Sequence, residues 1–263
     1  MKKRLLRNRH LLLTLLLGLG FLWGGTGIQW NRPLLHPDGL STLGELFVTM
    51  ITPDLSGDIL ALGLRGAWRT LVYATCGMSL AGLLGIPLGI LASGTPVGND
   101  GIGWVFTGAL RPVLGLMRSI HELVWAWLFV AAFGLTPLAA VAAIAIPYSG
   151  ILGRIFADLL NDVEDEPLRM LRSSGASPLQ TFVYGRLPQV VPDLISYSLY
   201  RYECAIRSAA IMSFVGLGGL GYQIEVSLAD LKFSQAWTFV YILILLILAV
   251  NLWSSETRRA LLR

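Results

Sequence analysis

Residues 161–188 read NDVEDEPLRMLRSSGASPLQTFVYGRLP, a polar segment that lies between two strongly apolar runs. Within it, Glu166-Pro167 predicts the start of a short helix, because proline is favoured at the first helical position. Gly175 predicts the end of that helix, because glycine adopts the left-handed conformation of a C-cap without strain. The first half of the segment is therefore expected to be one short helix.

A second short helix is predicted directly after the first. Ser177 supplies the N-cap hydroxyl, Pro178 takes the first helical position and Gln180 completes a capping box. Leu187-Pro188 is expected to stop this helix, since proline lacks a backbone N–H. An ordinary helical connection is the alternative, but a doubly capped connection of this length indicates a docking role.

The chain as a whole is strongly apolar. Of its 263 residues, 54% are hydrophobic and 14% are charged, whereas a soluble domain carries about a quarter charged residues. The mean hydropathy is +0.65. The surface itself must therefore be apolar, which predicts an all-α integral membrane protein with a bilayer as its solvent. Cys76 and Cys204 both lie inside apolar runs and are interpreted as small core residues, not as a disulfide or metal pair.

Apolar runs of about 20 residues predict membrane-spanning helices. About six are expected, near residues 11–27, 71–92, 104–134, 138–160, 192–214 and 236–253. The first run has the composition of a signal peptide, but no A-x-A-like cleavage site follows, so an uncleaved span is favoured. A glycine-rich turn is expected over residues 216–221, followed by a short polar loop.

Charged residues predict the orientation of these spans. The N-terminal tail, the 161–188 segment and the C-terminal tail are rich in basic residues, and six spans place all three on one side. By the positive-inside rule, both termini are expected in the cytoplasm. Residues 28–65 then lie outside, where Thr42 and Glu45 have capping-box spacing and predict a short amphipathic helix. The net charge of +4 suits this orientation better than nucleic-acid binding.

The polar segment resembles the coupling loop of ABC importer permeases. That family carries Glu-Ala-Ala, three residues, Gly, nine residues and then Ile-x-Leu-Pro, and here Gly175 and Leu187-Pro188 keep the spacing. Gly185 stands where isoleucine is usual. The chain departs from the pattern at Glu-Ala-Ala, where it has Arg-Met-Leu at residues 169–171.

The resemblance implies a type I ABC importer permease fold and a loop, about residues 163–188, that fits a groove on a cytoplasmic ATPase. The residues implied to couple to the ATPase are Arg172, Gly175, Ala176, Ser177, Pro178, Leu187 and Pro188. The expected division of the chain is an N-terminal transmembrane anchor and periplasmic segment (1–65), the importer transmembrane domain (66–255) and a cytoplasmic tail (256–263).

Five further stretches are similar to the phosphonate-type branch of these permeases. They are RSIHELV (118–124), LPQVVP (187–192), ISYSLYRYE (195–203), RSA (207–209) and VGLGGLG (215–221). The resemblance implies a bacterial inner-membrane permease for phosphonates, phosphite or hypophosphite. Its implied partners are a second copy of the chain, cytoplasmic ATP-binding subunits that hold ATP and magnesium, and a periplasmic binding protein. A permease for methionine or another small solute is the alternative.

Ionisable residues inside the predicted spans are expected to face the bundle interior or a wet cavity. Arg118 and Glu122 are four residues apart, as are Glu203 and Arg207, so each pair is expected to form an intrahelical salt bridge. Arg201 has no acidic partner at helical spacing. The alternative is that these residues serve an anion pathway, in which positive charge is favourable. The candidate pathway residues are Arg118, Glu122, Ser198, Arg201, Glu203 and Arg207.

Other functions are disfavoured by the motifs. Residues 216–221 have G-x-G-x-x-G spacing, but they follow an apolar helix instead of the strand that a dinucleotide site requires. The sequence has no Walker A motif and no metal-spaced His/Cys cluster, so no cofactor or metal is expected on this chain. An intramembrane enzyme that uses His121, Glu122 and Glu203 is the alternative to a permease, but both glutamates have candidate arginine partners.

Overall fold

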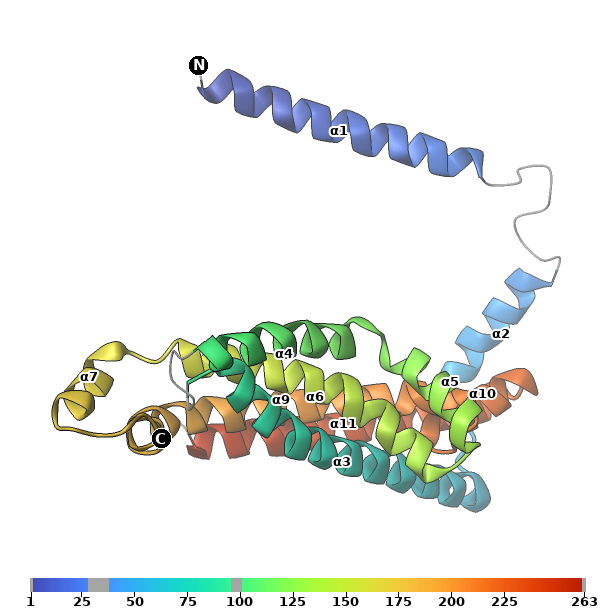
Figure 1. The fold of residues 1–263 in the computed structure, drawn as a ribbon. Coiled ribbons are helices and arrows are strands. Elements are labelled where there is room, and N and C mark those ends of the chain that lie inside the picture. Colours follow the sequence, from blue (N-terminus) through green and yellow to red (C-terminus); the bar gives the residue numbers. More distant parts are fainter. Residues whose placement is uncertain (1, 28–37, 96–100, 262–263) are drawn as a thin grey trace. The chain divides into compact units, whose positions relative to one another are not determined.

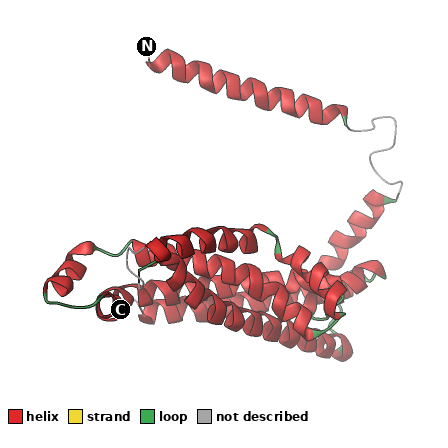
Figure 2. Ribbon diagram, in the orientation of Figure 1, coloured by secondary structure: helices red, strands yellow, loops and turns green. Residues whose placement is uncertain are grey.

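The computed structural model describes residues 2–27, 38–95 and 101–261, and every regular element in these ranges is a helix (Figure 2). The fold is therefore all-α, as predicted. The chain divides into two compact units, Met1–Val48 and Thr49–Arg263.

The first unit contains helix α1 (Lys2–Thr26) and most of helix α2 (Gly39–Ile51) (Figure 1). Large apolar side chains of α1 are exposed along its length; Leu17 is 75% exposed and Phe21 84%. Such a helix is suited to lipid, because exposed apolar surface is unfavourable in water.

Helix α2 is the short helix predicted between residues 28 and 65, but its predicted start was wrong. It begins at Gly39, and the Thr42 hydroxyl donates to the carbonyl oxygen of Asp38 at 2.9 Å. Thr42 therefore lies inside the first turn and is not an N-cap. A hydroxyl can bond a carbonyl four residues back as well as a free N–H, and sequence spacing does not distinguish the two.

The second unit is a helical bundle (Figure 1). Its elements are α3 (Gly57–Ser93), α4 (Gly101–Ser119), α5 (Glu122–Phe133), α6 (Pro137–Asn161), α7 (Asp165–Ser173), α8 (Pro178–Gln180), the π-helix η1 (Thr181–Arg186), α9 (Leu187–Met212), the 3-10 helix η2 (Ser213–Val215), α10 (Leu220–Ala229) and α11 (Phe233–Leu261).

Local sequence explains the ends of several of these helices. Thr136 caps α6 by accepting a hydrogen bond from the N–H of Ala139 at 3.4 Å, and Pro137 takes the first helical position. Gly94 ends α3 with a φ of +70°. The span predicted over residues 138–160 is thus confirmed as α6.

The continuous helix predicted over residues 104–134 was wrong. It breaks between α4 and α5, and the two parts meet at 88°. His121 makes the break, because its Nδ1 accepts from the N–H of Leu123 at 3.2 Å and so caps α5. Apolar composition alone predicted one helix, because a histidine cap has no strong sequence signature.

The number of spans is smaller than predicted in the described ranges. Three helices, α3, α6 and α11, are long and apolar enough to cross a bilayer. Two bent pairs raise the number to five if each pair is one span: α4 with α5, and residues 178–215 with α10. The apolar part of α1, His10–Thr26, is shorter than these.

The glycine-rich turn after α9 is confirmed, but the polar loop after it was wrong. Gly216, Gly218 and Gly219 have φ values of +90°, +77° and +107°, which side-chain-bearing residues rarely adopt. The chain then forms α10, with Leu220 and Ile224 buried. The polar residues of this segment suggested a loop. Leu220 and Ile224 instead pack against Phe239 of α11, which stabilises the helix.

Helices α3 and α6 pack at the centre of the bundle through small residues. A Cβ on Gly89 would lie 2.8 Å from the carbonyl oxygen of Gly153 and 2.8 Å from the Cβ of Phe156. A Cβ on Gly85 would lie 3.1 Å from the carbonyl oxygen of Ser149. The two backbones therefore approach more closely than larger residues would permit, as is typical of membrane helices.

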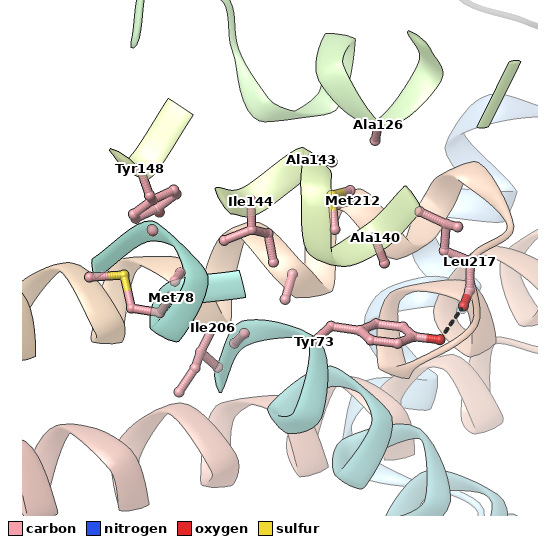
Figure 3. Packing of buried hydrophobic residues seen from close by; sticks show 14 of the residues in the cluster. Tyr73, Met78, Ala126, Ala140, Ala143, Ile144, Tyr148, Ile206, Met212 and Leu217 are labelled. Carbon is pink, nitrogen blue, oxygen red and sulfur yellow. Dashed lines mark hydrogen bonds between the residues drawn. The ribbon is translucent and has the colours of Figure 1, made fainter. Parts of the chain in front are cut away.

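A cluster of buried apolar side chains joins α3 and α6 to α9 (Figure 3). Ile144 of α6, Met78 of α3 and Ile206 of α9 meet in it. The Tyr73 hydroxyl donates to the carbonyl oxygen of Leu217 at 3.1 Å, which ties α3 to the glycine turn.

We expect Gly89→Ala to destabilise the protein by about 1–3 kcal/mol, because the added methyl group collides with backbone that cannot move aside cheaply. Gly82 of the same helix has no atom within 4 Å of an added Cβ, so Gly82→Ala serves as the matched control. It should be neutral or stabilise by up to about 1 kcal/mol. Thermal unfolding in one detergent measures both, and equal melting temperatures would contradict the packing argument.

Candidate functional site

The first half of the 163–188 loop is helix α7, which starts earlier than predicted. Glu164 is its N-cap residue, so Pro167 occupies the third helical position and not the first. The predicted end is confirmed: Gly175 has a φ of +88°, and the N–H of Ala176 donates to the carbonyl oxygen of Leu171 at 3.1 Å. This closes the C-terminus of α7 with a left-handed glycine.

The capping box after this turn is confirmed. Ser177 Oγ accepts from the N–H of Gln180 at 3.3 Å, and the N–H of Ser177 donates to Gln180 Oε1 at 2.8 Å. Pro178 takes the first helical position. The sharp change of direction between the two helices is therefore held by local hydrogen bonds.

The predicted stop at Leu187-Pro188 was wrong, because the helix continues into α9. The turn before the proline widens to a π-helix, in which the N–H of Leu187 donates to the carbonyl oxygen of Phe182. The side-chain amide of Gln189 donates to the carbonyl oxygen of Gly185 at 2.7 Å. A widened turn accommodates a proline that an unbroken α-helix would not.

The two halves of the loop pack against each other at Gly185, a role that sequence reasoning missed. A Cβ on Gly185 would lie 2.7 Å from Leu171 Cδ1 and 2.8 Å from Leu168 Cδ2, and Leu168 is fully buried. Arg186 also donates a hydrogen bond to the carbonyl oxygen of Leu160 at the end of α6. A glycine stands in the usual isoleucine position because Leu168 and Leu171 of α7 occupy the space that a side chain would need.

Three of the residues predicted to couple to an ATPase lie around one polar cavity. Arg172, Ala176 and Pro178 line a space of about 500 Å³ at the base of the loop. The other lining residues are Ser93, Gly94, Thr95, Asn161, Thr181, Phe182 and Arg186. The loop, the end of α3 and the end of α6 therefore meet at one place.

The predicted ion pair between Arg118 and Glu122 was wrong. The break between α4 and α5 separates the two residues, since four-residue spacing brings side chains together only on a continuous helix. Glu122 instead accepts a hydrogen bond from Ser208, whose hydroxyl lies 3.0 Å from that of Tyr148. The carboxylate also lies 3.9 Å from His121 Nε2.

The predicted pair between Glu203 and Arg207 was also wrong. Glu203, 9% exposed, accepts from Arg258 Nη2 at 2.8 Å, and the Arg258 side chain is 26% exposed. Arg207 donates to Cys204 Sγ at 3.7 Å and has no ion pair among the described residues. Arg258 was assigned to a tail by sequence, and its 55-residue separation from Glu203 gave no signal for the contact.

Arg201 forms no ion pair among the described residues, as predicted, but it has a tyrosine partner one turn away that the sequence analysis did not identify. Its Nε donates to the Tyr197 hydroxyl at 2.8 Å, and its guanidinium lies 5.1 Å and 5.6 Å from the ring centres of Tyr197 and Tyr200. Hydroxyl and rings hold the cation without neutralising it. Ser198 is elsewhere: it donates to the Leu194 carbonyl and lines an apolar groove of about 560 Å³ with Thr75 and Trp253.

We expect Arg258→Ala to destabilise the protein by about 3–5 kcal/mol, because it leaves Glu203 buried without a counter-charge. Arg207→Ala should cost less than about 1 kcal/mol, because Arg207 is exposed and has only a weak sulfur contact. Thermal unfolding of both variants in one detergent compares them. A larger loss for Arg207→Ala would restore the pairing that the sequence spacing predicted.

The comparisons with known proteins agree on a transport function. Residues 85–259 match the family model described as a binding-protein-dependent transport system inner membrane component. HtxC of Stutzerimonas stutzeri, provisionally assigned as a phosphite transport system permease protein, is 33% identical over 85% of this chain and 77% of its own length. The phosphite transport system permease protein PtxC of the same organism is 27% identical over 84% of this chain and 78% of its own.

A third relative and two solved structures extend the comparison. The phosphate-import permease protein PhnE of Mycolicibacterium smegmatis is 31% identical over 86% of this chain and 41% of its own. An inward-facing MetNI methionine ABC transporter chain has a TM-score of 0.68 at 20% identity, covering 80% of this chain and all of its own. An amino acid ABC transporter chain has a TM-score of 0.64 at 18% identity, and the match covers 76% of this chain and 94% of the transporter chain.

At these identities, the solved structures concern the fold alone, which is that of a type I ABC importer permease. The family match covers well over half of the chain and includes the 163–188 loop and the residues of α9. The chain belongs to the family of binding-protein-dependent transport system inner membrane components.

Proposed function

We propose that this chain is the permease subunit of an ABC importer that moves phosphonates or reduced phosphorus oxyanions, such as phosphite and hypophosphite, into the cell. The relatives described above are named for phosphite and phosphate transport. The observation that carries the proposal is that neither arginine of α9 has a carboxylate partner: Glu203 is paired with Arg258, and Asp193 forms no ion pair with Arg201 or Arg207 among the described residues.

The charge balance of α9 suits an anion. Arg258 neutralises Glu203, so Arg201 and Arg207 have no carboxylate partner among the described residues. Ser208 contributes a hydroxyl on the same helix, already bonded to Glu122. A pathway for phosphorus oxyanions benefits from such unneutralised cations, whereas a neutral solute would gain nothing from them.

The six pathway residues inferred from sequence remain in the proposal, but the structure suggests a different role for some of them. Arg201 and Arg207 are assigned to face the anion, and Arg118, which is exposed, adds a third cation near the bend before α5. Glu122 and Glu203 position their neighbours through Ser208 and Arg258. Ser198 is assigned to the apolar groove between α3 and α9.

The 163–188 loop is proposed to dock into a cytoplasmic ATPase, which holds ATP and magnesium. Its rigid corner at Gly175 and its direct continuation into α9 support this role, because displacement of the loop would move the helix that bears Arg201. Arg172, Ala176, Ser177 and Pro178 form the proposed contact, and Leu187 and Pro188 the junction with α9. ATP-driven movement of the loop would thus alternate access to the pathway.

The proposed assembly is a homodimer in the bacterial inner membrane, with two ATPase subunits and a periplasmic binding protein. Two ATPase subunits require two loops, and one chain supplies one loop. Both termini are proposed to lie in the cytoplasm, on the side of the loop. In this assembly the chain is a conduit and not an enzyme, since hydrolysis belongs to its partner.

A methionine permease is the weaker alternative. The solved methionine transporter shares the fold at 20% identity, while the more similar relatives carry the names of phosphorus compounds. A methionine zwitterion also has no net charge for the arginines of α9 to attract.

The test of the proposed function is the ATPase activity of the reconstituted complex with its binding protein. Phosphonates, phosphite, hypophosphite, phosphate and methionine are added separately. We expect stimulation by a phosphonate or a reduced phosphorus oxyanion. Stimulation by methionine alone would keep the fold and overturn the substrate, and failure to form any complex with an ATPase would overturn the docking role of the loop.

We expect Arg201→Gln to lower phosphite uptake at least about tenfold, because a lost charge-assisted hydrogen bond is worth about 1.5–3 kcal/mol. Tyr197→Phe keeps the ring and removes the hydroxyl that accepts from Arg201, so its effect should be smaller. Uptake into proteoliposomes measures both variants, with size-exclusion chromatography to verify assembly. Unchanged uptake in an assembled Arg201→Gln complex would remove Arg201 from the pathway.

A further inference from the structure

A second pair of cations lies at the end of the bundle opposite the 163–188 loop. Arg65 and Arg69 are one turn apart on α3, near the start of α10, while α7 lies at the other end (Figure 1). Neither arginine forms a hydrogen bond or an ion pair with any residue in the described ranges. Like charges at this spacing repel each other, so the pair is unfavourable without an anion.

The two arginines line one cavity of about 550 Å³. The other lining residues are Leu62, Leu64, Gly66, Trp68, Gly219 and Gln223. None of these described residues is acidic. Asp58 and Glu225, the nearest acidic residues along α3 and α10, form no ion pair with either arginine in the described structure. The cavity therefore presents positive charge and N–H donors, a combination that suits an oxyanion.

The wall of the cavity is held in place by the glycine turn. A Cβ on Gly218 would lie 3.0 Å from Arg69 Nη1, so this guanidinium rests directly on the turn. The N–H of Leu220 donates to the Thr70 hydroxyl at 3.0 Å, one residue beyond Arg69. The arginine and the turn are thus fixed relative to each other, which lowers the cost of ordering a site around a ligand.

We propose that Arg65 and Arg69 bind a phosphate-type oxyanion at this end of the bundle, which is the outer mouth if the proposed function is correct. The tetrahedral anion would accept hydrogen bonds from both guanidinium groups beside the glycine turn. The inference rests on the proposed function for its assignment to the outer side, and it adds a site separate from Arg201. Two sources share this chemistry: the transported oxyanion itself and the phosphate of a lipid headgroup.

The lipid source has its own support. Trp68 and Leu64 are 67% and 65% exposed beside the arginines, and tryptophan next to basic residues is typical of the level of lipid headgroups. The experiment must therefore separate a free anion from a bound lipid.

The test uses the full chain in nanodiscs, in an Arg118→Gln/Arg201→Gln/Arg207→Gln background that removes the three proposed pathway arginines. The probes are phosphite, followed by phosphorus NMR line broadening in phosphatidylcholine discs, and phosphatidylglycerol, followed by native mass spectrometry of retained lipid. Arg65→Gln/Arg69→Gln is compared with Arg259→Gln, an exposed arginine that pairs only with Glu256 in the described structure. Loss of two charged donors should weaken binding of one probe at least about tenfold in the double variant, with no change in the control.

Each outcome bears on the site. Weaker phosphite binding identifies the transported class of anion as the ligand, and weaker lipid retention identifies the headgroup. Equal binding of both probes by the double variant and the control overturns the inference. The proposed function is judged separately by ATPase stimulation in the complex. A lipid-binding site without stimulation by any phosphonate or reduced phosphorus oxyanion would overturn the function and leave the site.

Discussion

The close contact between α3 and α6 is the constraint on which the rest of the bundle depends. In a bilayer no hydrophobic force drives one helix onto another, so association relies on packing between backbones that approach closely. Gly85 and Gly89 permit that approach against Gly153. Helix α3 extends from Gly57 to Ser93. Its first half lies beside the glycine turn, and its C-terminal end lies beside the 163–188 loop.

Charge inside the bundle follows from the same packing. The α4–α5 break brings Glu122 to Ser208, and the long α11 brings Arg258 to Glu203. Both carboxylates are therefore bound by groups far away in sequence, which leaves Arg201 and Arg207 on α9 without acidic partners in the described ranges. A buried charge requires a partner, so the packing that supplies Arg258 to Glu203 also leaves the two arginines of α9 without an ion pair in the described ranges.

Rules that act within one turn of the chain worked well here. The capping box of Ser177, the left-handed Gly175 and the glycine turn that begins at Gly216 were all predicted from sequence and are present. Rules that assume an uninterrupted helix worked less well. The pairing of Arg118 with Glu122 failed at the histidine cap of α5, and the stop at Pro188 failed because the preceding turn widens to a π-helix.

The sequence by itself determined the membrane environment, the helical fold class, the family resemblance and the two-helix form of the loop. These follow from composition and from caps and turns, whose energetics involve residues within a few positions of one another. Only the tertiary structure decided which charges are neutralised, why Gly185 is a glycine and where Arg65 and Arg69 meet the glycine turn. Those features depend on contacts between different helices, from Gly185 with Leu171 to Leu220 with Thr70, and such contacts are set by how the helices pack.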